Sequence, residues 1–410
     1  MGQIDLGTCG HHSKMVERMN SESPLQRTVF PTRKLVVGCL LPVLLLGSVV
    51  VWLSLHFQRA VRMPVSRLPA STRGAQHEDY VGSQGCAICH ARQVDEYAQS
   101  GHARTFYRTD DGRFDAQVDG RQFKDPERGV TFHYHAGPGG LSVTLPERFP
   151  DDAFPLHFGL GSGQHAITFM TLVPGTDGQA VGIEHRVSLF GEDHEPGLTP
   201  SHRGQAVTQE VEHFGRVRSP ELLDRCLGCH TTTYRRQGLK LTELQPHVGC
   251  ESCHGPARRH VEQMQHGTID DTLGLTAIRW TATEQIERCG KCHRRPDMLE
   301  SPLEPDNVKL VRYAPVGILQ TACYRKSEGR LSCMTCHDPH RPVSRDTQHY
   351  ETRCLSCHSA EPDQQVSCKV SSQKGCIACH MPQVEVHPGM SMSDHWIRVR
   401  DADGLMSKER

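Results

Sequence analysis

The sequence predicts a mostly α-helical and irregular domain that carries a small antiparallel β insertion and follows one N-terminal transmembrane helix. Three observations in the 410-residue chain lead to this fold class. The segment C-x-x-C-H occurs seven times. A run of 23 residues near the N-terminus contains no Asp, Glu, Lys or Arg. Strand-like patterns are concentrated between the first two C-x-x-C-H segments.

The composition indicates that side chains alone do not fill the core. Only 36% of the residues are apolar and 6% aromatic, whereas globular domains are roughly 45–50% apolar. A chain this polar has trouble burying enough surface to offset its conformational entropy, so we expect a bound group in the core. The formal net charge is −1, with 46 basic and 47 acidic residues, which argues against a nucleic-acid partner.

The repeated segment identifies that group. Two Cys three residues apart lie on one face of a helical turn, where both can form thioethers with one haem, and the next His can bind the iron. A zinc ribbon needs no His after each second Cys, and a thioredoxin-like pair occurs only once. We therefore expect seven covalent haems c, attached at motifs 1 to 7 in chain order. Their cysteines are Cys86 and Cys89, Cys226 and Cys229, Cys250 and Cys253, Cys289 and Cys292, Cys333 and Cys336, Cys354 and Cys357, and Cys376 and Cys379; the proximal histidines, in the same order, are His90, His230, His254, His293, His337, His358 and His380.

The spacing of the motifs predicts one continuous domain over residues 80–400. Six of the seven motifs fall within residues 226–380. So little chain for each haem forces the porphyrins into mutual contact, and the haems replace a side-chain core. We expect electrons to pass from one haem to the next.

The uncharged run at residues 35–57 is long enough to cross a bilayer as a helix. A cleaved signal peptide is the alternative; the long preceding segment, the length of the apolar run and the lack of an A-x-A site argue against it. Flanking positive charges are balanced and do not set the orientation. Because c-type haems are attached outside the cytoplasm, we expect a single-pass anchor in the bacterial cytoplasmic membrane. Residues 1–34 are then cytoplasmic, residues 58–79 form a tether, the haem domain lies on the periplasmic side, and residues 401–410 form a polar tail.

Residues 115–215 contain the predicted β insertion. Residues 130–134, 141–145, 167–173 and 183–190 are β-rich or alternating and are bounded by Gly and Pro. A structural lid over the first haem is a simpler interpretation of this insertion than a substrate-binding module. After it, Ser219 and Pro220 form a good helix start that leads into Cys226.

Four motifs match a known family beyond the motif itself. The matching stretches are CAICH at 86–90 with YAQSGH at 97–102, GCESCHGP at 249–256 with His260, Cys323-Tyr324 with LSCMTCHDPH at 331–340, and CIACHMP at 376–382 with Asp394-His395. Over most of residues 80–400 the chain resembles multihaem c-type cytochromes related to cytochrome c-554/c-552, the tetrahaem cytochrome that accepts electrons from hydroxylamine oxidation.

The resemblance implies haems with two His ligands. It gives His102, His260, His340 and His395 as the distal ligands, with His340 expected to bind a haem next to its own motif. His165 and His213 are two further candidates, followed by His247 and His387.

Two functions follow from these expectations. The first is electron transfer between a membrane quinol or periplasmic donor and a redox partner protein, with membrane lipid around the anchor. The second is an oxidoreductase that acts on a small nitrogen or sulfur compound at one haem with an open position. The missing C-x-x-C-K motif argues against the lysine-ligated nitrite reductases, and surplus His does not prove a His at every iron.

Overall fold

The computed structural model describes residues 76–175, 178–268, 280–299, 303–304, 307–358, 368 and 374–399. Contacts divide the chain into residues 1–66 and 67–410, and every described residue belongs to the second unit. The predicted cytoplasmic segment, the transmembrane helix at residues 35–57, most of the tether and the polar tail lie outside the described residues. Among the helices that are described, none combines the length and apolar character needed to cross a bilayer.

The expectation of a mostly α-helical and irregular domain is wrong. The described residues form fourteen strands in four antiparallel sheets beside eleven α-helices, several of them only one turn long. The physical reason lies in the motif itself: it needs only about one turn of helix, so much of the chain between motifs is free to form hairpins and sheets.

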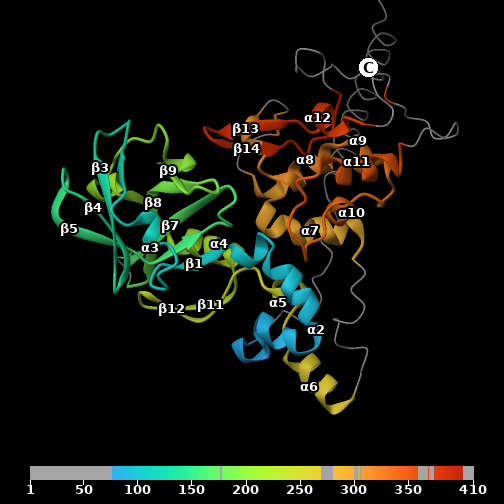
Figure 1. Cartoon of the computed structure of the whole chain (residues 1–410), viewed down its shortest axis with the longest axis horizontal. Coiled ribbons are helices and arrows are strands. Elements are labelled where there is room, and N and C mark those ends of the chain that lie inside the picture. Colours follow the sequence, from blue (N-terminus) through green and yellow to red (C-terminus); the bar gives the residue numbers. More distant parts are fainter. Residues whose placement is uncertain are drawn as a thin grey trace, which may run out of the picture. The chain divides into compact units, whose positions relative to one another are not determined.

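Two of the sheets build a β region between residues 106 and 218 (Figure 1). The larger has the order β1-β6-β7-β8-β10, with β9 also paired to β8, and the smaller has the order β2-β3-β4-β5. The strands of the larger sheet are β1 (Phe106–Arg108), β6 (Phe158–Leu160), β7 (Ala166–Pro174), β8 (Ala180–Phe190), β9 (Glu195–Leu198) and β10 (Gly215–Arg218); those of the smaller are β2 (Gln122–Lys124), β3 (Thr131–Gly137), β4 (Gly140–Leu145) and β5 (Phe149–Leu156).

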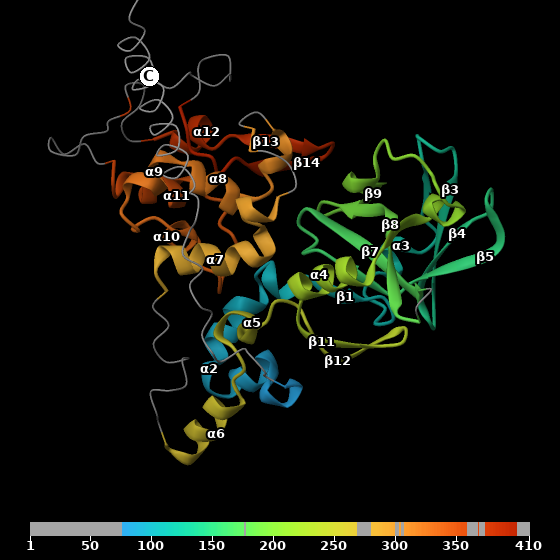
Figure 2. The same cartoon turned by 180° about the vertical axis from the view of Figure 1, so that it is seen from behind.

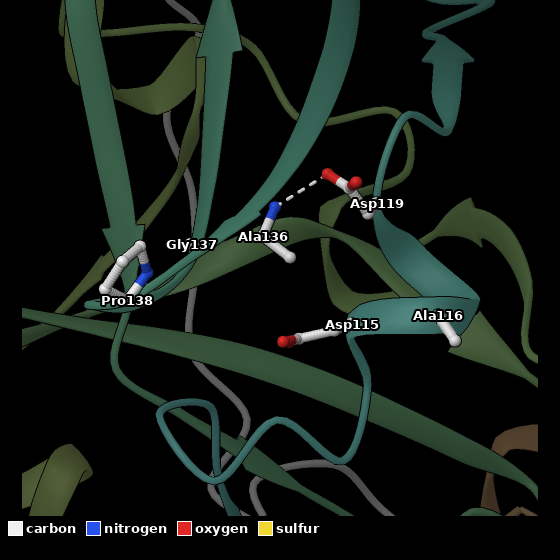
Figure 3. Close-up of a pocket in the computed structure, with 6 residues that line it drawn as sticks. All are labelled: Asp115, Ala116, Asp119, Ala136, Gly137 and Pro138. Carbon is white, nitrogen blue, oxygen red and sulfur yellow. Dashed lines mark hydrogen bonds between the residues drawn. The ribbon is translucent and has the colours of Figure 1, made fainter.

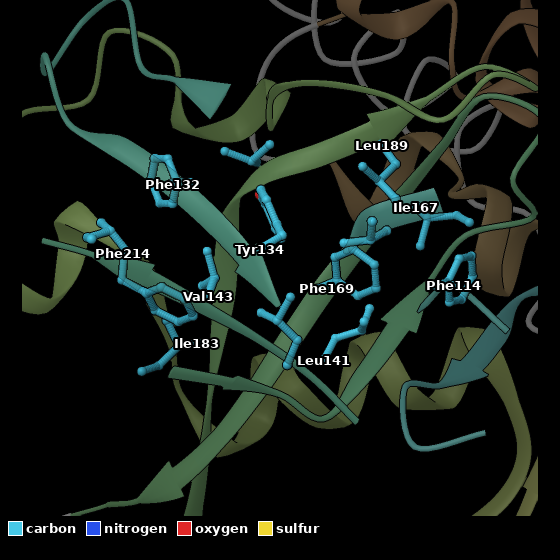
Figure 4. Close-up of a cluster of buried hydrophobic side chains, with 14 of the residues drawn as sticks. Phe114, Phe132, Tyr134, Leu141, Val143, Ile167, Phe169, Ile183, Leu189 and Phe214 are labelled. Carbon is cyan, nitrogen blue, oxygen red and sulfur yellow. The ribbon is translucent and has the colours of Figure 1, made fainter. Parts of the chain in front are cut away.

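Alternating apolar residues from both sheets form the core of the β region (Figure 4). Phe132 and Val143 from the smaller sheet and Phe169 from the larger are fully buried. His185 lies in the same core, where Tyr134 Oη is 2.8 Å from its Nε2 and the Phe214 carbonyl is 3.2 Å from its Nδ1. Because both ring nitrogens have partners, this buried imidazole is accommodated without a charge.

The motifs lie on or at the ends of helices. These are α2 (Gly82–Ala98), α4 (Pro220–His230), α5 (Cys250–His254), α7 (Ala282–His293), α10 (Cys333–Cys336), α11 (Thr347–Leu355) and α12 (Cys376–His380). The remaining α-helices are α3 (Asp115–Val118), α6 (Arg258–His266), α8 (Ala314–Gln320) and α9 (Ala322–Lys326), and the remaining hairpins are β11 (Thr231–Gln237) with β12 (Lys240–Pro246) and β13 (Gln383–His387) with β14 (Met390–Ser393). Helices that carry different motifs are neighbours: α2 contacts α5, α7 contacts α10, and α11 contacts α12 (Figure 2).

Helix α4 joins motif 2 to the β region. It starts as predicted, because Ser219 Oγ accepts a hydrogen bond from the Leu222 amide and Pro220 is the first helical residue. Its apolar side chains Leu223 and Leu227 are fully buried in a cluster with residues of β1, β6 and β7, and Cys226 packs against the same cluster. The first cysteine of motif 2 is thereby fixed against the larger sheet.

Candidate haem-binding sites

Within the described residues, four of the seven motif histidines face a histidine from elsewhere in the chain. Each pair joins the imidazole that ends one motif to a side chain that follows a different motif, so no pair is local in sequence. The ring centroids are 6.5 Å apart for His90 and His260, 6.1 Å for His293 and His102, 6.1 Å for His254 and His340, and 6.2 Å for His337 and His395.

These separations fit two axial ligands on one haem iron. An imidazole nitrogen binds a first-row transition metal at about 2.0 Å, and in a five-membered ring with bonds of about 1.33 Å the nitrogen is roughly 1.1 Å from the centroid. Two imidazoles on opposite faces of one iron therefore place their centroids roughly 6.2 Å apart. The angles between the ring planes range from 18° to 75°, and rotation about the iron–nitrogen axis leaves the separation unchanged.

Hydrogen bonds at Nδ1 orient two motif histidines, His230 and His380, and the candidate distal ligand His395. The Nδ1 of His230 lies 2.9 Å from the Thr105 carbonyl oxygen, and that of His380 lies 2.9 Å from the Arg398 carbonyl oxygen. The Nδ1 of His395 lies 3.0 Å from the Ser393 carbonyl oxygen. A proton held on Nδ1 by such an acceptor leaves the lone pair of Nε2 free for iron, as in metal-binding histidines generally.

Burial keeps His293 and His337 in the neutral form that binds iron. Loss of solvent lowers the pKa of His293 to about 4, with the nearby His102 as a further cause. Loss of solvent also lowers the pKa of His337 to about 4, with His395 contributing. At neutral pH both rings therefore have a lone pair available.

Cysteines of different motifs lie beside one another, which orders the sites in space. The thiol of Cys86 in motif 1 is a hydrogen-bond neighbour of Cys250 in motif 3. Motif 4 has two such neighbours: Cys292 lies beside Cys229 of motif 2, and Cys289 lies beside Cys333 of motif 5. Haems attached through neighbouring cysteines would be adjacent, and motif 4 would stand between motifs 2 and 5.

Glu251, inside motif 3, ties that motif to motif 1. Its buried carboxylate accepts hydrogen bonds from the backbone amides of Val81 at 3.0 Å, Gly82 at 2.8 Å and Ala257 at 2.8 Å. The first two amides belong to the start of α2, where unpaired N–H groups and the helix dipole favour an anion. The carboxylate thus fixes the helix that bears Cys86, Cys89 and His90.

The other candidate ligands are placed differently. His213 is buried in the β region beside Phe214, and its charged neighbours are Arg148, Arg128, Glu210 and Arg186, none of which belongs to a motif. His387 accepts a hydrogen bond at Nε2 from Arg203 at 2.8 Å and stacks on Phe190. His165 precedes β7 and is exposed. Within the described residues, none of the three forms a ring pair with a motif histidine.

Near motif 2 lie His247, which is one of the further ligand candidates, and three residues that sequence reasoning did not name: Phe106, Tyr107 and Arg113. The backbone amide of Phe106, next to the Thr105 that contacts His230, donates to His247 Nδ1 at 3.2 Å. His247 packs edge-on against Tyr107 at 6.2 Å, and the Arg113 guanidinium lies 5.3 Å from the centre of the Tyr107 ring. Of these residues the sequence named His247 alone, three residues before motif 3.

A hollow of about 520 Å³ lies apart from the motif residues. It is lined by Asp115, Ala116, Asp119, Ala136, Gly137 and Pro138 of the β region. Figure 3 shows the carboxylate of Asp119 accepting a hydrogen bond from the Ala136 amide. With no Cys or His in its lining, this hollow is not one of the haem sites.

The chain is similar to known multihaem proteins. The family described as cytochrome c554 and c-prime matches residues 197–255, which contain motifs 2 and 3. The chain is 26% identical over 185 residues to the dissimilatory sulfite reductase MccA of Wolinella succinogenes, a match over 34% of this chain and 23% of that protein. It therefore spans less than a quarter of this curated relative. The crystal structure of the outer cell wall cytochrome OcwA superposes with a TM-score of 0.46 and 14% identity, over 78% of this chain and 80% of that one.

Proposed function

Taking the chain as a multihaem c-type cytochrome with covalently bound haem c, we propose that it is an electron-transfer protein with seven haems. The observation that carries the proposal is the set of four imidazole pairs with centroids 6.1 to 6.5 Å apart. Haem iron with two His ligands changes its oxidation state without exchanging a ligand and so carries electrons.

The residues around the pairs support this role. Each pair joins two histidines that lie far apart in the sequence. His395 and His340 are each held at Nδ1, by the Ser393 carbonyl oxygen and by Asp338 Oδ1. Such fixed ligands keep the rearrangement that accompanies a change of charge small.

Partners and location are part of the same proposal. Haem attachment to C-x-x-C-H motifs takes place outside the cytoplasm, so we place the domain on the periplasmic side of the cytoplasmic membrane. There a membrane quinol or a periplasmic protein would supply electrons, and a second redox protein would accept them.

A second candidate function, reduction or oxidation of a small oxyanion, rests on motif 2. In the described part of the chain no imidazole ring pairs with His230, so a haem held there would be free to bind water or a small ligand. Loss of solvent lowers the pKa of His247 to about 4, and its Nδ1 accepts from Phe106, so its proton is on Nε2 and available to donate. Arg113 adds a positive charge nearby. A relative named as a sulfite reductase makes sulfite one anion to test.

Protein-film voltammetry distinguishes the two functions. An electron carrier gives reversible signals that do not change when sulfite, nitrite or hydroxylamine is added. An enzyme gives a catalytic current with one of them, and Arg113→Ala and His247→Ala should each reduce that current while leaving the non-catalytic signals in place. A catalytic current that survives both substitutions would remove motif 2 as the site.

A further inference from the structure

Helix α8 lies directly against the chain segment that carries His395. Gly317, in the middle of this helix, is fully surrounded by protein, and its closest neighbours are the backbone atoms of His395 and Trp396. We infer that Gly317 is a positioning residue that sets where His395 stands opposite His337. The inference rests on the proposed role of this pair as haem ligands.

The need for glycine here is one of space. A Cβ built on Gly317 would lie 2.7 Å from the carbonyl carbon of His395, 2.7 Å from the Trp396 amide nitrogen and 3.1 Å from His395 Cβ. The backbone of Gly317 is helical and has no positive φ, so the chain conformation alone would accept any L-residue. Two of the three contacts are with backbone atoms, which cannot rotate out of the way as a flexible side chain can.

The segment is also held from its other sides. The Asp394 amide donates to the Pro382 carbonyl at 3.0 Å, and Asp394 Oδ1 accepts from the Trp396 amide at 2.9 Å. The preceding β13–β14 hairpin is fixed to the β region at His387, which accepts from Arg203 at 2.8 Å and stacks on Phe190 at 5.2 Å with an angle of 7°. Because these contacts hold the segment in place, a methyl group at position 317 would displace the backbone of His395.

The expected displacement of His395 is large compared with the variation in ligand distance that a metal site accepts. Ordinary contact for a Cβ begins at about 3.4 Å, against the 2.7 Å found here, so the backbone of His395 would have to move by roughly 0.7 Å. Ligand distances in metal sites are kept within about 0.2 Å, and functional groups within about 0.5 Å. We expect the bond from His395 to the iron at motif 5 to be broken or strongly weakened.

Three variants of the full-length holoprotein test this inference: Gly317→Ala, His395→Gly and Gly139→Ala. Gly139 is the matched control, since a Cβ there would meet nothing within 4 Å. The readouts are the high-spin signal in electron paramagnetic resonance and the amount of carbon monoxide bound per protein after reduction. Gly317→Ala and His395→Gly should each gain one high-spin, carbon monoxide-binding haem per chain relative to wild type, and Gly139→Ala should gain none.

The double variant Gly317→Ala/His395→Gly separates a shared site from two independent effects. Because both changes act on one haem, the double variant should also gain one such haem and not two. Glycine at position 395 also removes the His395 Cβ that would lie 3.1 Å from the new methyl carbon. If Gly317→Ala alone yields little protein, recovery of the double variant would therefore place the clash at position 395.

The outcomes distinguish this inference from the proposed function. If His395→Gly gains a high-spin haem and Gly317→Ala keeps the wild-type signal, Gly317 does not position the ligand. A gain of two haems in the double variant leads to the same conclusion. If His395→Gly itself leaves the spectra unchanged, the assignment of His395 as a ligand fails, and the inference fails with it.

Discussion

His340 faces His254 with ring centroids 6.1 Å apart and ring planes inclined by 24°, although it follows His337 by only three residues. His337 itself faces His395. The intervening Pro339 carbonyl accepts a hydrogen bond from His102, the partner of His293. Residues 337–340 therefore touch the sites of motifs 3, 4 and 5, so a disturbance in this short segment should affect more than one haem.

Replacement of His340 by Ala tests this relationship. We expect the haem at motif 3 to lose its distal ligand, because His254 would then face no imidazole. The variant should gain one high-spin haem that binds carbon monoxide when reduced, with the total haem content unchanged. Low-temperature electron paramagnetic resonance and carbon monoxide titration measure the two effects.

His260 and His266 provide a matched pair on one helix. Both lie on α6, but His260 faces His90 whereas His266 is exposed at the last position of the helix. His260→Ala should produce the same gain of one carbon monoxide-binding haem, and His266→Ala should not. Equal behaviour of these two variants would remove His260 as a ligand of the haem at motif 1.

The haem content provides a test that does not depend on distal ligands. Seven C-x-x-C-H motifs predict seven haems per chain in an alkaline pyridine haemochrome assay. All should remain with the protein after acid–acetone extraction, because thioether bonds survive it. Four or fewer haems, in protein from a host that can attach haem c, would contradict the seven-haem proposal.

Glu251→Gln should weaken the link between motifs 1 and 3. The amide cannot provide the charge that the three backbone N–H donors now share, so we expect a loss of about 1–3 kcal/mol in the free energy of unfolding. Denaturant unfolding of the holoprotein followed by circular dichroism measures it. Glu262→Gln, an exposed position on α6, is the control and should change stability by no more than about 0.5 kcal/mol.

The β region should lose stability as the pH falls below about 6.5. Burial lowers the pKa of His185 from its ordinary value of 6.5 to about 3. Between pH 6.5 and pH 3 the imidazole is therefore protonated in the unfolded chain but neutral in the folded core. Burial alone would raise the pKa of Glu184, but His202 and Arg218 outweigh it and bring the pKa to about 2. The stabilisation that ionised Glu184 gives the folded state is also lost as the pH falls, below about pH 4.5.

Hydrogen exchange in β7 and β8 at pH 7 and pH 5 measures this effect. For one proton the free energy of opening should fall by about 1.4 kcal/mol per pH unit. His185→Gln removes the titrating ring and should reduce the slope. An opening free energy independent of pH in the wild type would show that His185 does not govern this stability.

The sequence allowed the haem motifs to be named, because the chemistry of haem attachment fixes its residues at short spacing. His102, His260, His340 and His395 were named from the family resemblance, and the fold brings each of them opposite a motif histidine. The helix start at Ser219 was also predictable from local capping. The extent of the sheets was not predictable. Strands β1 and β10, at the edges of the larger sheet, are only three or four residues long. They form because they pair with neighbouring strands, so no local sequence pattern indicates them.

Long-range contacts were equally hidden. Glu251 reads as a variable residue inside a motif, yet it caps a helix that begins 169 residues earlier in the chain. Gly317 belongs to no sequence motif. Its proposed role depends on contact with the backbone of His395, which lies far away in the sequence and is adjacent only in the folded chain. His213 was a reasonable candidate by residue type, but the fold places it among arginines of the β region.

The central proposal is that haems with two His ligands carry electrons through this chain. Near-infrared magnetic circular dichroism of the fully oxidised protein tests it most directly, because the charge-transfer bands of low-spin haem identify the axial ligand pairs and can be counted against total haem. Four imidazole pairs predict that at least four haems show the bis-imidazole signature. Fewer than four such haems would contradict the account.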